Sequence, residues 1–127
     1  MFFDLDNLNP GTWFDLPGGG KICLRILPLD DAFKISKEIT KKRVEYKQGQ
    51  RFEVEDVDEH RNLALTWDYI ILDWEGVKSK DGKEIPCTTE MKARLMGGSP
   101  SFGKVVRDFV NHLNELEATE QEAEAKN

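Results

Sequence analysis

The sequence predicts an α+β fold, with an N-terminal β-hairpin packed on a small bundle of about four helices. Alternating apolar residues flank a Pro-Gly-Gly-Gly turn near the N-terminus, and apolar residues further along recur at helical spacing. The last eleven residues carry many charges and no large apolar side chain. We therefore predict a single domain over residues 1–116, followed by an acidic, disordered tail over residues 117–127.

Length and charge limit the class of protein. The chain has 127 residues, with 24 acidic and 18 basic side chains and a net charge of −6. It contains no apolar run near the ~18–20 residues that span a bilayer, and its first residues lack the pattern of a secretory signal. We expect a protein that is neither membrane-spanning nor secreted. Its two cysteines, Cys23 and Cys87, read as reduced thiols, although a single bridge stays open.

The predicted hairpin begins with residues 11–16, which are rich in strand-forming side chains. Residues 17–20, Pro-Gly-Gly-Gly, form its turn because glycine adopts positive φ angles freely. Residues 21–27 alternate as a second strand, with one apolar face made by Ile22, Leu24 and Ile26.

A helix and a charged segment follow. Asp30 is a suitable N-cap for a helix that reaches about Thr40. In residues 41–55, apolar side chains alternate on both sides of Gln48-Gly49, which predicts a polar hairpin. The charged composition of this segment also allows a mobile loop.

The central helix is predicted to begin at Asp56, which forms a capping box with Glu59. Its apolar face is made by Leu63, Trp67, Ile70, Ile71 and Trp74. Gly76 would terminate it. Residues 69–72 have the composition of a strand, which is the alternative.

The C-terminal half begins with residues 77–87, which hold a turn signal and fit a small hairpin or an exposed loop. A short helix over 89–96 is stopped by Gly97-Gly98. The last helix starts with Ser99 as N-cap and Pro100 at the first position. Its apolar face consists of Phe102, Val105, Val106, Phe109, Val110, Leu113 and Leu116.

Enzyme signatures are incomplete. The Gly-rich turn before Lys21 lacks the first Gly and the final Ser or Thr of a phosphate-binding loop, and Ser99 lacks the second Gly of a nucleophile elbow. The cysteines and histidines have no metal-binding spacing. We therefore assign no catalytic, cofactor-binding or metal-binding residue and expect a protein that is not an enzyme.

Basic residues gather between residues 34 and 51, where seven Lys and Arg face two Glu, a local charge of +5. A basic stripe with interleaved aromatic residues is typical of nucleic-acid binding. The net charge of the chain opposes binding to a polyanion, which argues against nucleic acid as the partner. Recognition of an acidic protein is the other interpretation. The candidate contact residues here are Lys41, Lys42, Arg43 and Tyr46.

The order of motifs in the second half resembles a known family. Residues 67–76, Trp-Asp-Tyr-Ile-Ile-Leu-Asp-Trp-Glu-Gly, precede an Asp81-Gly82 turn and the step Ile85-Pro86-Cys87-Thr88. A final apolar helix introduced by Ser99-Pro100 follows. This order resembles the small tail assembly chaperones of long-tailed bacteriophages and prophages, and the resemblance covers about residues 11–116.

The resemblance implies a non-enzymatic chaperone without a cofactor, acting in the cytoplasm of the bacterial host. Such proteins coat the tape measure protein, help recruit tail tube subunits, and act in several copies, which makes self-association possible. Aromatic and Met side chains would hold such a client, although the same residues are equally suited to a core. The candidates are Trp74, Met91, Met96 and Phe102. The alternative function is a small nucleic-acid-binding or regulatory protein that uses residues 34–51.

Overall fold

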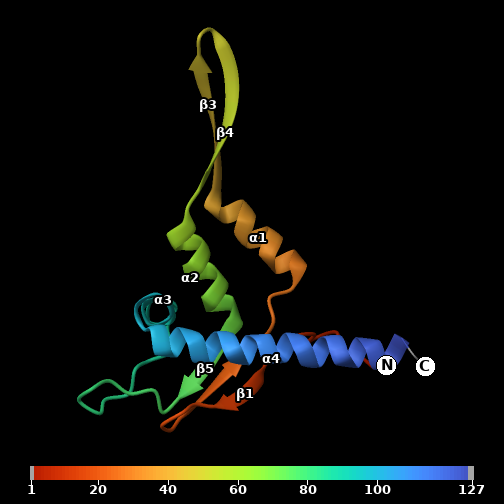
Figure 1. The fold of residues 1–127 in the computed structure, drawn as a ribbon, viewed down its shortest axis with the longest axis vertical. Coiled ribbons are helices and arrows are strands. Elements are labelled where there is room, and N and C mark those ends of the chain that lie inside the picture. The colour runs from red at the N-terminus through yellow and green to blue at the C-terminus, as the bar shows by residue number, and fades with distance from the viewer. Residues whose placement is uncertain (1, 126–127) are drawn as a thin grey trace.

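The computed structural model describes the backbone of residues 2–125 and the side chains of residues 2–117. The predicted α+β class with an N-terminal hairpin is confirmed (Figure 1). In chain order the elements are β1 (Thr12–Asp15), β2 (Lys21–Leu24), α1 (Leu29–Ile39), β3 (Thr40–Lys47), β4 (Gln50–Val57), α2 (Glu59–Ile70), β5 (Ile71–Glu75), α3 (Thr89–Gly98) and α4 (Pro100–Ala125).

A three-stranded antiparallel sheet has the order β1-β2-β5. Strand β2 is the central strand, and this position explains why Ile22, Cys23 and Leu24 are all buried, on both faces of the sheet. Prediction of the hairpin from its turn was therefore correct, but the strand is more deeply enclosed than a two-stranded hairpin allows.

Strand β5 corrects the predicted central helix. The helix ends at Ile70 and the chain continues as a strand, so residues 71–75 were wrongly placed on a helical face. The physical reason is strand pairing: β5 pairs with β2, with Ile22 opposite Trp74. The backbone groups on the edge of β2 that faces away from β1 thereby gain hydrogen-bond partners. The indole Nε1 of Trp74 then donates to the carbonyl of Ile85 at 2.7 Å.

The hydrophobic core lies between this sheet and helices α3 and α4. Aromatic contacts join the layers, because Phe14 stacks on Phe109 with ring centroids 4.5 Å apart and Trp74 meets Phe102 edge-on. The buried members of the core are Ile22, Leu24, Ile70, Ile71, Trp74, Met96, Val106 and Leu113.

The C-terminal elements follow their local signals closely. Residues 77–87 include a small hairpin, with a bridge between Lys78 and Glu84. Helix α3 continues through Gly97 and ends at Gly98, two residues later than predicted, with Ser99 as its C-cap. The Ser99 hydroxyl accepts a hydrogen bond from the Phe102 amide at 3.3 Å, which confirms the predicted N-cap of α4.

Helix α4 extends to Ala125, past Leu116, where the apolar pattern ends. The predicted disordered tail covers residues 117–127. Its side chains beyond Glu117, and residues 126–127 altogether, lie outside the described residues.

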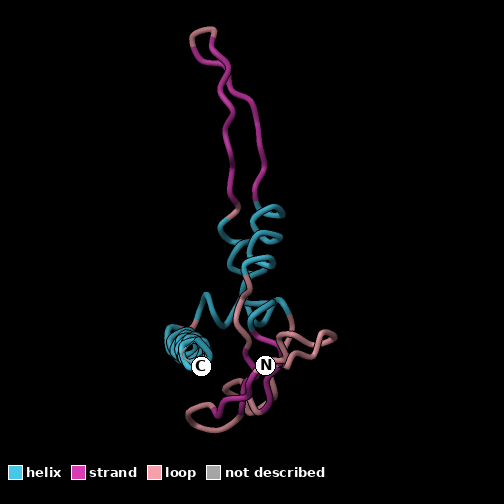
Figure 2. Tube along the Cα trace, turned by 90° about the vertical axis from the view of Figure 1, so that its right-hand side faces the viewer, coloured by secondary structure: helices cyan, strands magenta, loops and turns pink. Residues whose placement is uncertain are grey.

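Helices α1 and α2 lie side by side, and β3 and β4 continue from them as a long two-stranded ribbon directed away from the rest of the molecule (Figures 1 and 2). Of the two predictions for residues 41–55, a polar hairpin or a mobile loop, the structure has the hairpin.

Two predicted caps were wrong. Helix α1 begins at Leu29 after Pro28, so Asp30 lies in its first turn, and Asp56 belongs to β4. Asp58 caps α2 instead and accepts from the Arg61 amide at 3.1 Å.

Candidate functional site

The two-stranded ribbon of residues 40–57, called the arm below, is the most distinctive surface of the protein. Its strands pair along their whole length, from Thr40 opposite Val57 to Lys47 opposite Gln50. Gln48 and Gly49 form the tip and both have positive φ angles, 51° and 78°, as a type I′ turn requires. At the base, the Asp58 amide donates to the Ile39 carbonyl at 3.0 Å and closes the arm.

The arm is solvent-exposed on both faces. None of its residues is buried, and only Thr40, Glu45 and Val54 are half-buried. Large apolar side chains are nevertheless exposed on it: Val44, Tyr46, Phe52 and Val57. An isolated two-stranded hairpin is marginally stable in water, and clustered exposed apolar groups mark contact surfaces. The arm therefore has the composition of an element that packs against another macromolecule.

Strand register divides the arm side chains between two faces, because residues directly opposite each other share a face and successive residues alternate. We call these the Tyr46 face and the Phe52 face. The Tyr46 face carries Thr40, Lys42, Val44, Tyr46, Arg51, Glu53, Glu55 and Val57. The Phe52 face carries Lys41, Arg43, Glu45, Lys47, Gln50, Phe52, Val54 and Asp56.

Arg43 organises the charges of the Phe52 face. Its guanidinium donates to Glu45 on the same strand, and its Nε donates to Asp56 Oδ2 at 2.6 Å. These hydrogen bonds, first the one that Glu45 accepts and then the one that Asp56 accepts, raise the pKa of Arg43 above its ordinary value. The Arg43 guanidinium is therefore already occupied within the arm.

The two strands carry opposite charge. Strand β3 has four basic residues and Glu45, giving +3, whereas β4 has Arg51 and three acidic residues, giving −2. The basic segment seen in the sequence thus lies beside an acidic strand, and the arm as a whole carries only +1. Such alternation suits a protein surface with charges of both signs better than a polyanion.

The structure separates the predicted contact residues into two groups. Lys41, Lys42, Arg43 and Tyr46 are exposed on the arm. Trp74 and Met96 are buried in the core, and Met91 and Phe102 pack against it. For Trp74 and Met96 the structure shows the core interpretation, since a buried side chain cannot meet a partner without rearrangement of the fold, whereas Met91 and Phe102 are only half-buried.

The sequence predicted this hairpin over residues 41–55, and in the structure its strands pair from Thr40 to Val57. Asp56 and Val57 are the part of β4 that sequence reasoning missed, because a helix was expected to begin at Asp56. The opposite charge of the two strands follows only from the register, which sets Lys42 opposite Glu55.

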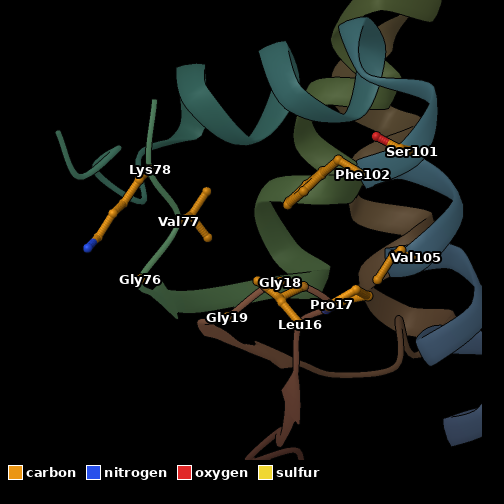
Figure 3. A pocket seen from close by; sticks show the side chains of 10 residues that line it. All are labelled: Leu16, Pro17, Gly18, Gly19, Gly76, Val77, Lys78, Ser101, Phe102 and Val105. Atoms are coloured by element: carbon orange, nitrogen blue, oxygen red, sulfur yellow. The ribbon is translucent and has the colours of Figure 1, made fainter. Parts of the chain in front are cut away.

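A cavity of about 420 Å³ opens between the β1–β2 turn, the exit of β5 and the start of α4 (Figure 3). Its walls are mainly apolar, with Leu16, Val77 and Phe102 among them, and the amino group of Lys78 points away from it. The residues that line it supply no carboxyl, imidazole or thiol group for acid–base chemistry.

Other potentially reactive groups have structural partners. Asp68 is paired with Lys92, and Asp73 accepts from the Trp74 amide at 2.8 Å. Cys23 and Cys87 form no disulfide. Burial raises the pKa of both thiols, so they are protonated near neutral pH. Among the described residues, no group of three or more His, Cys, Asp or Glu side chains could hold a metal ion.

Comparison with known proteins identifies the family. Residues 30–127, which are 98 of the 127 residues, match the family model described as YdaY prophage protein. The chain belongs to the YdaY prophage protein family. The YdaY match begins at α1 and contains the whole arm, whereas the β1–β2 hairpin precedes it. No curated protein and no solved structure matches the chain. Within the described part of this YdaY protein, no helix combines the length and apolarity needed to cross a membrane.

Proposed function

We propose that this prophage protein is a non-enzymatic tail assembly chaperone, which uses the arm to bind the tape measure protein in the cytoplasm of the bacterial host and assists tail tube assembly. The observation that carries the proposal is the arm itself, with apolar and charged side chains exposed along its full length. Membership of a prophage family and the motif order of residues 67–92 support it.

The arm offers a client three kinds of contact. Its two outer edges have unpaired backbone groups that can accept an added strand. Its exposed aromatic rings, Tyr46 and Phe52, supply the large contact area that is typical of binding hot spots. Its strands of opposite charge fix the orientation of a partner that carries both signs. A long client with a repetitive surface would be covered by several such copies.

The test is co-expression of the full chain with the tape measure protein of the same prophage, followed by measurement of the soluble complex. Phe52→Ala should weaken binding about tenfold or more, as expected for a central aromatic contact. The matched control is Trp13→Ala in β1, because Trp13 and Phe52 are equally exposed, at 45% and 44%. Absence of a complex, or equal loss from both variants, contradicts the proposal.

Nucleic-acid binding is the second candidate, favoured by one observation: a basic strand with an exposed tyrosine on a two-stranded ribbon, a shape that fits the major groove. The acidic strand β4 opposes it. Binding to random duplex DNA at about 50 mM salt, where phosphate contacts are strongest, would support this function, and its absence would eliminate it.

A further inference from the structure

The half of the molecule that carries the arm buries little of its own surface. From residue 29 to residue 69, which covers α1, the arm and nearly all of α2, Ile39 is the single buried residue. Leu29, Phe33 and Leu63 are exposed on the two helices, in addition to the apolar side chains of the arm. This stalk of residues 29–69 therefore leaves its apolar groups for another surface to cover.

The Tyr46 face is complementary to itself. A two-fold axis parallel to the strands would place β3 of one copy over β4 of the other, with each residue above the one that it opposes in register. Lys42 then lies over Glu55 and Tyr46 lies over Arg51, while Val44 lies over Glu53 and Thr40 over Val57, each contact occurring twice. The first pair is an ion pair and the second is a cation–π contact.

The other ways of pairing two arms lack this complementarity. On the Phe52 face the same rotation would set Glu45 over the Phe52 ring and Arg43 over Val54. The one pair of opposite charges on this face, Lys41 over Asp56, uses a carboxylate that Arg43 already engages. Two-fold pairing through the edges would bring β3 against β3 or β4 against β4. Each of these pairings places strands of like charge side by side.

We propose that the Tyr46 face is a docking surface for the Tyr46 face of a second copy of this chain. The arm stands clear of the rest of the molecule, so both of its faces are open (Figures 1 and 2). Stacked ribbons lie about 10 Å apart, a gap that Lys42 and Glu55 span together. The Phe52 faces and all four outer edges remain free, so the dimer keeps two client sites, whereas Tyr46 becomes part of the contact between the two copies.

The contact is modest in size and its affinity is correspondingly limited. Eight-residue strands extend about 26 Å, and one face of a two-stranded ribbon covers less than the ~800 Å² per partner of a standard interface. Phe33 and Leu63 are also exposed on α1 and α2, the helices that adjoin the base of the arm. We expect a dimer that dissociates on dilution through the micromolar range and weakens with added salt.

The test is sedimentation of the pure full-length protein, without any client. Lys42→Glu and Glu55→Lys should each weaken self-association about tenfold or more, because each places like charges in both symmetric contacts. An equimolar mixture of the two variants should restore the dimer. In the mixed dimer, the two acidic side chains of the Lys42→Glu chain would face the two basic side chains of the Glu55→Lys chain, so both symmetric contacts would again be opposite in charge.

Mixing the two variants distinguishes loss of a contact between two chains from damage within one chain. Both variants still carry like charges opposite each other inside their own arm, and an arm damaged in folding could not be rescued by a partner. Lys41→Glu, the same charge change on the Phe52 face, is the matched control and should leave the dimer intact. A wild-type protein that stays monomeric up to about 1 mM, variants that still dimerise, a mixture that does not recover, or equal loss from Lys41→Glu would each overturn the proposal.

Discussion

At the scale of the single residue, Lys92 is the most unusual side chain because its residue is 7% exposed yet carries an ammonium group. Its Nζ lies 3.2 Å from Asp68 Oδ1 and 3.2 Å from the Asp68 carbonyl oxygen. The Thr89 hydroxyl donates to the same carboxylate at 2.7 Å. Burial of a charge is unfavourable unless it is paired, so this contact fixes how α3 sits against α2.

We predict an asymmetry between the two partners. Asp68→Asn should destabilise the protein by about 1–3 kcal/mol, because it leaves the buried ammonium of Lys92 without its carboxylate. Lys92→Met should be milder, because Met fills the same space and the Asp68 side chain, 38% exposed, keeps its contact with water. Denaturant unfolding of both variants measures the difference. If Lys92→Met were instead the more destabilising change, the Asp68 carboxylate would depend on the pair more than the Lys92 ammonium does.

The same carboxyl predicts a dependence on pH. Burial raises the pKa of Asp68, but the hydrogen bonds from Thr89 and Lys92 and the charge of Lys92 outweigh it, so the pKa lies below its ordinary value. Its contribution to stability is therefore complete above the unfolded pKa of about 3.9 and is lost as the pH falls through the folded pKa. Acid titration monitored by tryptophan fluorescence should show a shallower loss of stability in Asp68→Asn, and parallel curves would exclude this role.

At the scale of the element, the β1–β2 turn and the exit of β5 touch backbone to backbone. Gly20 and Gly76 both have positive φ angles, 88° and 71°. A Cβ on Gly20 would lie 2.7 Å from the Glu75 carbonyl oxygen, and a Cβ on Gly76 would lie 2.9 Å from the Gly20 Cα. No side chain fits between these segments, so the two glycines let the sheet close against its own turn.

Alanine substitutions separate this contact from the general effect of removing glycine. Gly76→Ala should cost about 1–3 kcal/mol, since it meets both strain and a clash. Gly97→Ala in α3, where the added Cβ would meet nothing within 4 Å, should instead stabilise the protein by about 0.5–1 kcal/mol. Thermal unfolding measures both changes, and a neutral Gly76→Ala would mean that the turn shifts freely.

Local signals in the sequence predicted those elements whose structure is decided locally. The Pro-Gly-Gly-Gly turn, the Gln48-Gly49 turn and the cap at Ser99 depend on the φ angles and hydrogen bonds of a few neighbouring residues. Strand β5 was predicted only as an alternative, over residues 69–72, because its conformation depends on pairing with β2, about fifty residues earlier. The N-cap of α2 is Asp58 and not the predicted Asp56, because β4 continues its ladder through Val57.

The candidate site was predictable to the same extent. Alternation around Gln48-Gly49 placed Lys41, Lys42, Arg43 and Tyr46 on a polar hairpin, which is where the structure has them. Periodicity alone does not distinguish a surface anchor from a core residue, so Trp74 and Met96 could not be assigned before their packing was known. The opposite net charges of β3 and β4 could be assigned only once their bounds and register were known.

At the scale of the whole molecule, the core and the arm are separate. The core cluster draws on β2, β5, α3, α4 and the end of α2, and the arm contributes no buried residue to it. Cooperative unfolding should therefore belong to the core, while the arm opens at a lower free energy.

Excision of the arm tests this separation. Thr40 and Val57 are paired directly, so a two-residue Asn-Gly turn can replace residues 41–56. The shortened protein should keep its cooperative thermal transition, with a free energy of unfolding changed by about 1 kcal/mol or less. Near-ultraviolet circular dichroism of the tryptophans reports whether the core survives. Loss of the transition would show that the arm belongs to the cooperative unit.

Because the base of the arm is closed, the length of its two strands sets how far the tip lies from the helices. Side chains alternate along each strand, so adding two residues to each would carry the tip about 6.6 Å farther while every original side chain keeps its direction. Adding a single residue to each would exchange the outward sides beyond the insertion point. An arm that keeps its binding face can therefore lengthen only by two residues per strand at a time. The structure of the helices at the base would be unaffected by such an insertion.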